Sequence, residues 1–289
     1  MLHEGDMGKK ERRQKHKHKD KKDKHSKFTA KTADKHLLYE ESVQNVEEEI
    51  KFLDRAYRDL RGRPAVTLRE DFAGTTAAAC EWVRTADNRQ AWAVDFEPEV
   101  LKWGRERHVK SLTVEQQQRI EQIEGNVLNT NTPLADMIVG FNFSYFVFKT
   151  RDKLREYFEQ ARRNLQSDGL FLIDCFGGSE ALEECEEETE QDDFTYVWDQ
   201  DSFDPISAHL MCHIHFHFPD GSKMRKAFSY DWRMWTLPEL RELLHEAGFR
   251  KSTVYWEGTD EDGEGNDEYT PVERGDADPA WIAYVVAER

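Results

Sequence analysis

The residues of this sequence that could do chemistry each follow a short apolar run. Glu70, Gly74 and Thr75 stand in "LREDFAGTTAAACEW", at the turn between a predicted strand and a predicted helix. A glycine lets the backbone approach a ligand closely, and a helix that starts there presents free N–H groups and the positive end of its dipole. The turn therefore predicts a site for an anionic group such as an amino-acid carboxylate, although it has only one glycine and no GxGxxG pattern.

A carboxylate follows the next apolar run, about twenty residues further on. The segment "AWAVDFEPEV" places Asp95 at the end of a predicted strand, where an acidic side chain can accept hydrogen bonds from both hydroxyls of a ribose. The alternative is structural, because an aspartate can also cap the helix that begins at Pro98.

Polar residues also follow the third and fourth apolar runs. Asn126 and Val127 in "IEGNVLN" could meet an adenine amino group with polar and backbone atoms. Asn142, Ser144 and Tyr145 in "ADMIVGFNFSYFVFK" end the fourth run, where a reacting group would lie. In doubly wound sheets, ligands bind outside the carboxyl ends of the strands, so the four elements predict one shared site.

The elements that position these residues alternate between strands and helices, as in parallel βαβ units. Strands are predicted at 65–70, 91–95, 120–124, 136–141 and 169–175, and helices at 76–85, 98–108, 113–118 and 151–165. "ISAHLMCHIHFHF", the turn "PDGS" and "KMRKAFSYDW" predict an antiparallel hairpin within an inserted region, 177–235. A helix at 237–247 and strands at 249–256 and 281–287 complete a Rossmann-like, doubly wound, seven-stranded sheet of the α/β class.

The N-terminal part of the chain differs in composition from the rest. Residues 1–36 carry a net charge of about +7 and almost no apolar side chains, which predicts a disordered basic arm that either contacts a polyanion or is merely solvated. Apolar residues from Val43 to Leu60 recur at three- and four-residue spacing and predict an N-terminal helix over 37–62. The predicted folded domain is 37–289.

Composition excludes several classes of protein. The chain lacks an uninterrupted apolar run of the length that crosses a bilayer, and charge occupies the place of a signal peptide, which predicts a cytoplasmic or nuclear protein with no membrane partner. Four widely spaced cysteines predict reduced thiols. The net charge is -17, and about -24 without the arm, so nucleic acid is disfavoured as a substrate of the folded part.

The ordered motifs resemble a known family. "EDFAGT", "VDFEPE", "EGNV", "NFSYFVFKTRDKL", "LQSDGLFLIDCFGG" and "DWRMWTLPELRELLHEAGF" are similar to class I S-adenosylmethionine-dependent methyltransferases. They are most similar to a branch with an EDFCGT-type first motif and an NFSY-type fourth motif. The resemblance covers roughly 37–289. Phe72 departs from it, because many relatives have a glycine there, so the loop must approach the methionine part differently.

The resemblance implies S-adenosyl-L-methionine as the cofactor and a set of residues that bind it. The predicted cofactor-binding residues are Glu70, Phe72, Gly74, Thr75, Asp95, Phe96, Asn126, Val127 and Asn142. Asn142 and Tyr145 are the predicted catalytic residues, and no metal is predicted. The acceptor is not identified by the sequence, although a small molecule or a protein side chain is preferred.

Three further features bear on the acceptor. The segment 257–278 holds ten acidic residues and one arginine; folded over the site, it would favour a cationic acceptor, whereas a distant solvated loop would not. Trp232 and Trp235 could form an aromatic wall around such a cation or belong to the core. His213, His215 and His217 share one face of a strand and are interpreted as its polar side rather than as metal ligands.

Two other functions remain open from the sequence. A nicotinamide-dependent oxidoreductase would use a similar strand order and an acidic residue like Asp95, but its pyrophosphate needs close glycines that "DFAGTT" lacks. A non-catalytic scaffold with a methyltransferase fold would use the basic arm to bind a polyanion.

Overall fold

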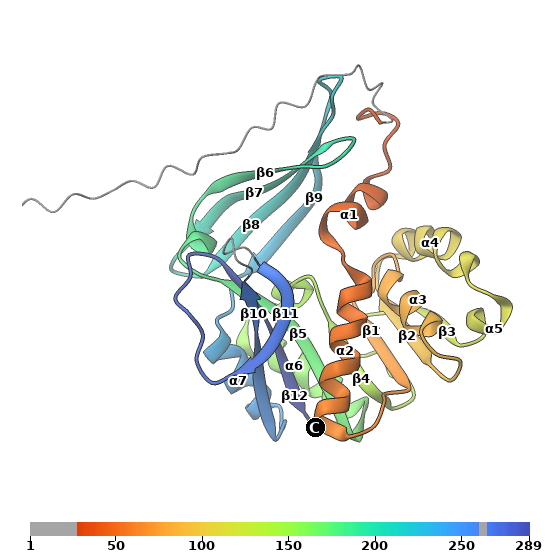
Figure 1. Ribbon diagram of the computed structural model, residues 1–289. Helices are drawn as coiled ribbons and strands as arrows, with labels where there is room; N and C mark the ends of the chain where they lie inside the picture. The colour runs from red at the N-terminus through yellow and green to blue at the C-terminus, as the bar shows by residue number, and fades with distance from the viewer. Residues whose placement is uncertain (1–27, 260–264) are drawn as a thin grey trace, which may run out of the picture.

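A computed structural model describes residues 28–259 and 265–289, which form two sheets (Figure 1). The larger sheet has eight strands in the order β11-β10-β12-β5-β4-β1-β2-β3. Strands β3, β2, β1, β4 and β5 run parallel, whereas β12, β10 and β11 are joined antiparallel at the β5 side. The strand bounds are β1 Thr67–Asp71, β2 Gln90–Asp95, β3 Ile120–Glu124, β4 Ala135–Gly140, β5 Leu165–Gly177, β10 Lys251–Thr259, β11 Gly265–Val272 and β12 Trp281–Glu288.

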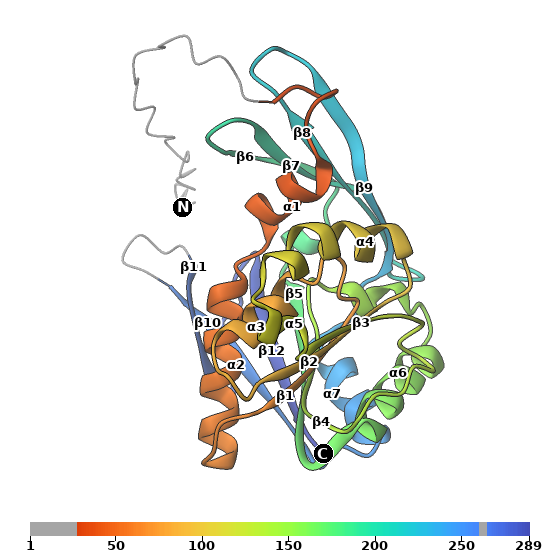
Figure 2. The same ribbon diagram turned by 90° about the vertical axis from the view of Figure 1, so that its right-hand side faces the viewer.

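Helices cover both faces of this sheet (Figure 2). Helices α2 and α3 pack in one apolar cluster with β1 and β2, whereas α6 and α7 pack in a second cluster with the other face of β4 and β5. The helix bounds are α2 Val46–Arg61, α3 Ala77–Arg84, α4 Pro98–Arg107, α5 Val114–Gln117, α6 Arg151–Arg163 and α7 Leu237–Glu246. Residues Leu170–Ile173 of β5 are fully buried, as expected of a strand covered on both sides. The predicted doubly wound fold is therefore confirmed.

The second sheet lies above the carboxyl ends of the parallel strands (Figure 1). It is antiparallel, with the order β6-β7-β8-β9. Its strands are β6 Cys185–Glu190, β7 Thr195–Asp204, β8 His209–His217 and β9 Lys223–Arg233. The predicted hairpin corresponds to β8 and β9, and the structure adds two strands. Strand β6 reads "CEEETE", and its nearly continuous acidic composition hides a strand whose pairing is supplied by β7.

Two further differences concern the ends of the domain. The predicted single helix over 37–62 is two helices, α1 (Lys35–Val43) and α2, because Gln44 is extended and Asn45 is non-helical. The acidic segment near the C-terminus contains β11, which extends the predicted seven strands to eight. In both places, pairing or packing with distant elements overrides the local pattern.

Helix α1 connects the two sheets. Leu38 is fully buried in a cluster with Ile214 and Phe216 of β8. On the other side, Glu40 accepts from His108 Nε2 at 2.6 Å, just beyond α4. Helix α1 therefore spans the space above the strand ends. No described helix is both long and apolar enough to cross a membrane.

Candidate active site

A cavity of about 590 Å3 lies at the carboxyl ends of β1, β2 and β4, and we call it the strand-end cavity. Helix α1, strand β9, Glu49 of α2 and the start of α4 supply its other walls. Most of the predicted residues line it, namely Glu70, Phe72, Gly74, Thr75, Asp95, Phe96 and Asn142. Because successive parallel strands end at one edge of a sheet, these residues lie together although they are far apart in the sequence.

The loop between β1 and α3 has an unusual backbone. Phe72, Gly74 and Thr76 have φ angles of 57°, 49° and 68°, in the left-handed region that costs energy for residues other than glycine. A Cβ on Gly74 would meet no atom closer than the Phe72 carbonyl oxygen at 4.0 Å. Phe72 thus adopts a left-handed turn that usually favours glycine, and Gly74 leaves open space beside the cavity.

Asp95 holds this loop in place. Its two carboxylate oxygens accept from the Gly74 N–H at 2.8 Å and from the Glu97 N–H at 2.9 Å. The side chain is largely buried, and burial raises its pKa. Since each carboxylate oxygen has two lone pairs, Asp95 can still accept two more hydrogen bonds from a ligand in the cavity.

Two further carboxyl groups face the strand-end cavity. Burial raises the pKa of Glu70 to about 8 and that of Glu49 to about 7. Glu70 accepts from the Ala79 N–H at 2.9 Å. The hydroxyl of Thr75 is buried and has no hydrogen-bond partner among the described residues. The cavity therefore offers acidic groups that a cation would stabilise and a buried hydroxyl that lacks a partner.

A smaller hollow of about 170 Å3, the side pocket, adjoins the strand-end cavity and shares Phe72, Asp95 and Phe96 with it. Asn126 and Val127, predicted to meet an adenine, line the side pocket. The Asn126 side-chain oxygen accepts from the Leu128 N–H at 2.9 Å and shapes the turn after β3. Phe96 is 63% exposed, so its ring is available to a flat ligand.

Asn142 and Phe143 form a second strained turn, directly after β4. Both residues are left-handed, with φ of 56° and 55°. The carboxylate of Asp174 accepts from their N–H groups at 2.6 and 2.9 Å. Asp174 is buried on β5, and burial raises its pKa to about 7. Asp174 was not predicted from the sequence; the available signal was an acidic side chain inside the buried run "LFLIDCF".

The structure does not bring Tyr145 to the site. Tyr145 is fully buried, and its hydroxyl donates to the Asp174 carbonyl oxygen at 2.6 Å. Because the hydroxyl points into the core beside β5 and does not line either cavity around Asn142, we correct the predicted catalytic role to a structural one. Through this hydrogen bond to β5, Tyr145 supports the turn at Asn142.

A third hollow, the aromatic cavity, lies between β5, β12 and the second sheet and has a volume of about 390 Å3. It shares Tyr39, Asn142, Tyr230 and Trp232 with the strand-end cavity. The Tyr230 and Trp232 rings stack with centroids 4.5 Å apart. Trp232 is therefore a wall residue, whereas Trp235 is a core residue whose indole N–H donates to the Phe148 carbonyl oxygen.

The histidines of β8 form hydrogen bonds that fix their tautomers. His215 Nδ1 accepts from the Lys226 N–H at 2.8 Å, and its Nε2 lies 3.0 Å from Asp199. His213 lies 2.8 Å from Ser229 through Nδ1 and 3.0 Å from the Lys226 ammonium through Nε2. Both ring nitrogens of His213 and His215 therefore have polar neighbours. His215 also lies close to Glu186 and Asp199, and His213 to Asp199 and Asp201, in two groups that could hold a metal ion.

The acidic segment 257–278 is described only in part. Asp260, Glu261 and Asp262 lie outside the described residues. Glu257 lines the aromatic cavity, and residues 265–272 form β11 at the edge of the larger sheet. The four cysteines are free and lie on separate elements.

Comparison with known proteins agrees with this geometry. Residues 71–173, which contain the strand-end residues from Phe72 to Asn142, match the family model described as a methyltransferase domain. No curated protein sequence matches the chain.

Solved structures with the same fold include three methyltransferases. An S-adenosylmethionine-dependent methyltransferase from Clostridium acetobutylicum has a TM-score of 0.65 at 15% identity, covering 88% of this chain and 96% of its own. The amino pentose methyltransferase CalS10 from Micromonospora echinaspora has 0.62 at 13%, covering 88% and 95%. The sugar N-methyltransferase KedS8 from a Streptoalloteichus species has 0.60 at 15%, covering 89% and 93%. The chain therefore has the fold of class I methyltransferases across both of its sheets.

Proposed function

We propose that this protein is a methyltransferase that uses S-adenosyl-L-methionine, with the methyl donor in the strand-end cavity and the acceptor in the aromatic cavity. The observation that carries the proposal is that the two cavities meet at Asn142, Tyr230 and Trp232. A transfer reaction needs two ligands that lie in contact across such a junction. The matched methyltransferase domain and the cofactors and activities named for the similar structures support this assignment.

The residues fit the donor group by group. Asp95 retains two acceptor positions for the ribose hydroxyls, and the side pocket, with Phe96 and Val127, suits the flat adenine. Glu70 and Glu49 complement the positive charges of the amino group and the sulfonium. Thr75 offers its unpartnered hydroxyl to the amino-acid part.

The donor supplies a methyl group attached to a positively charged sulfur, which is already a good leaving group. The chain must therefore exclude water and align the acceptor with the methyl–sulfur bond. The Asn142 turn stands at the junction, fixed by Asp174. Helix α1 and strand β9 close the strand-end cavity above it.

The charges around the strand-end cavity count against a nicotinamide dinucleotide. Six acidic residues line it, against Lys35 and His36 as the basic ones. A pyrophosphate is anionic and would be repelled, whereas a cationic sulfonium is favoured. The junction of the two cavities also counts against a purely structural scaffold. The basic arm as a polyanion contact stays a proposal, because residues 1–27 lie outside the described part.

Transfer of label tests the function directly. Cell extract is incubated with the protein and S-adenosylmethionine that carries an isotopically labelled methyl group, and products are separated by mass. We expect label in a small molecule or a protein side chain, and much less labelling by an Asp95→Asn variant at the same donor concentration. Equal labelling with and without the protein would count against the proposal.

Donor binding is expected to strengthen as the pH rises from 6 to 8. The pKa values of Glu49 and Glu70 are raised to about 7 and about 8, so both groups are partly protonated in this range when no ligand is bound. A bound cation favours the carboxylates, lowers their pKa values and releases protons. Titration calorimetry with S-adenosylhomocysteine, which keeps the ammonium group, should show about tenfold tighter binding at pH 8 than at pH 6.

Glu49 and Glu70 also determine how the stability of the ligand-free protein changes with pH. Because their folded pKa values are raised, the stability that they contribute is present at low pH and is lost as the pH rises through 7 to 8. The Glu70→Gln variant should show a flatter pH dependence of both binding and unfolding. Proton release on binding can be measured by calorimetry in buffers of different ionisation heat. Proton uptake instead would contradict the predicted role of Glu49 and Glu70.

Gly104→Ala is expected to weaken S-adenosylhomocysteine binding at least about tenfold. A Cβ on Gly104 would lie 2.0 Å from the Thr75 carbonyl oxygen, so α4 or the loop must move. Alanine raises helix propensity by about 1 kcal/mol, which offsets part of the packing cost. The exposed neighbour Lys102→Ala serves as the control, and equal affinities of the two variants would show that the loop position does not matter.

A further inference from the structure

We infer that the acceptor is a compact amine, protonated in solution, which binds in the aromatic cavity with its nitrogen toward Asn142. This inference rests on the proposed methyltransferase function and deepens it. It follows from the charge of the cavity, from its aromatic walls and from the residues that its lining shares with the strand-end cavity.

The charged side chains that line the aromatic cavity are all acidic. Glu180, Glu187 and Glu257 line it, and lysine, arginine and histidine are absent from its described lining. The three carboxylates come from three separate elements of the chain. Such a cavity attracts a cation and repels a carboxylate or phosphate.

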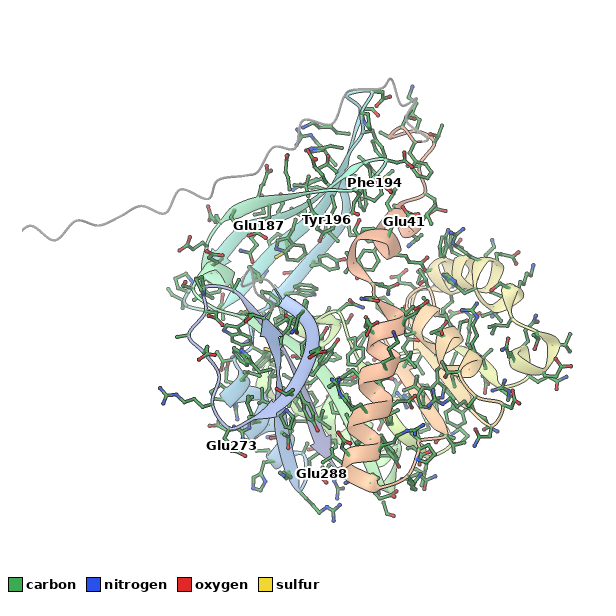
Figure 3. All side chains as sticks on the ribbon, viewed as in Figure 1. Glu41, Glu187, Phe194, Tyr196, Glu273 and Glu288 are labelled. Carbon is green, nitrogen blue, oxygen red and sulfur yellow. The ribbon has the colours of Figure 1, made fainter. Side chains whose placement is uncertain are left out.

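The strand register makes one wall both acidic and aromatic. Glu187 of β6 pairs directly with Trp198 of β7, and both line the cavity. Figure 3 labels Glu187 and Tyr196 on this second sheet. The Trp198 ring lies 6.2 Å from the Trp232 ring, which reaches the strand-end cavity. Ring faces attract a cation, more strongly when the cation is desolvated.

The size of the aromatic cavity suits a small molecule rather than a polypeptide segment. Its volume of about 390 Å3 lies within the range of small-ligand sites. Trp281 lines the cavity and lies so close to Gly177 that a Cβ there would be 2.2 Å from its ring. An apolar or sugar-like ring can therefore contact the aromatic side chains of the lining while the amine points toward Asn142.

The chemistry of an amine is consistent with these groups. The ammonium form binds the acidic cavity, loses a proton to solvent or to a carboxylate, and then has a nitrogen lone pair. That lone pair forms the new N–C bond as the methyl–sulfur bond breaks, and the sulfur keeps the electron pair. The product is again cationic, and the charge that sulfur loses is carried by nitrogen.

The test compares a cation and a neutral molecule of the same shape. The protein is first saturated with S-adenosylhomocysteine, whose binding is measured by calorimetry. Phenyltrimethylammonium and tert-butylbenzene are then titrated and observed by NMR. We expect the cation to bind at least about tenfold more tightly, a difference that corresponds to about 1.4 kcal/mol.

Variants locate the effect in the aromatic cavity. The Glu187→Gln, Glu257→Gln double variant should lose most of the preference for the cation while it still binds S-adenosylhomocysteine. Glu186→Gln is the matched control, because Glu186 is exposed on β6 and is not part of the cavity lining. Trp198→Leu should weaken the binding of the cation more than the binding of the neutral molecule.

The outcomes separate the two proposals. Equal binding of both probes, failure of the cation to bind, or equal behaviour of the double variant and the control would overturn the amine inference while the methyltransferase function stands. Failure of S-adenosylhomocysteine to bind at the first step would overturn the proposed function and, with it, the amine inference.

Discussion

Asp95→Asn is expected to weaken the binding of S-adenosylhomocysteine about 100-fold, or about 2.7 kcal/mol. In the native chain both carboxylate oxygens accept backbone N–H groups of the loops beside the cavity. The asparagine amide keeps one acceptor oxygen and turns the other position into a donor, so the ribose loses an acceptor and the Gly74 loop loses its anchor. Hydrogen bonds to a charged group contribute about 1.5–3 kcal/mol each. Titration calorimetry measures the loss.

The control for Asp95 lies at the end of the next strand. Glu124 pairs in register with Asp95, is exposed and does not line any of the three hollows. Glu124→Gln removes the same charge from the same edge of the sheet and should bind S-adenosylhomocysteine within about twofold of the native protein. Equal losses in the two variants would mean that charge at this edge, rather than contact by Asp95, controls binding.

Asp174→Ala is expected to lower the turnover number about 100-fold while S-adenosylhomocysteine affinity changes within about threefold. Asp174 is the acceptor for the N–H groups of Asn142 and Phe143, and both of these residues have strained backbones. Without the carboxylate the turn relaxes, and a displacement of about 1 Å at a reacting centre costs about 100-fold in rate. The unfolding midpoint should fall as well, because two buried N–H groups lose their acceptor.

A companion variant separates the backbone turn from the Asn142 side chain. Asn142→Gly suits the positive φ of 56°, so the protein should be as stable as the native chain or slightly more so. If the amide itself contacts the acceptor, turnover falls although the turn persists. Full activity in both Asp174→Ala and Asn142→Gly would show that this turn has no part in the reaction.

The strand-end residues could be predicted because their positions follow from one rule. Glu70, Asp95 and Asn142 each stand at or just after the end of a buried parallel strand, and such strands end at a common edge. The order of the motifs along the sequence was therefore enough to predict that these three residues lie at one site. Tyr145 was assigned by its nearness to Asn142 in sequence, but the turn after β4 directs its side chain into the core.

The other half of the site could not be predicted from local patterns. Trp198, Tyr230 and Glu187 reach the aromatic cavity from the second sheet, whose first strand is acidic and whose placement depends on packing against α1. Glu49 reaches the strand-end cavity from α2, before the first strand. Side chains of this kind are brought to a site by tertiary contacts, and periodicity within a segment carries no information about them.

Titration of the purified protein with S-adenosylhomocysteine and, separately, with NAD tests the proposed cofactor. One molecule of S-adenosylhomocysteine is expected to bind each chain, with affinity that rises between pH 6 and 8, and NAD is expected to produce no binding heat. Binding of NAD alone would contradict the assignment in favour of an oxidoreductase. Binding of neither ligand would contradict it in favour of a scaffold that retains a methyltransferase fold.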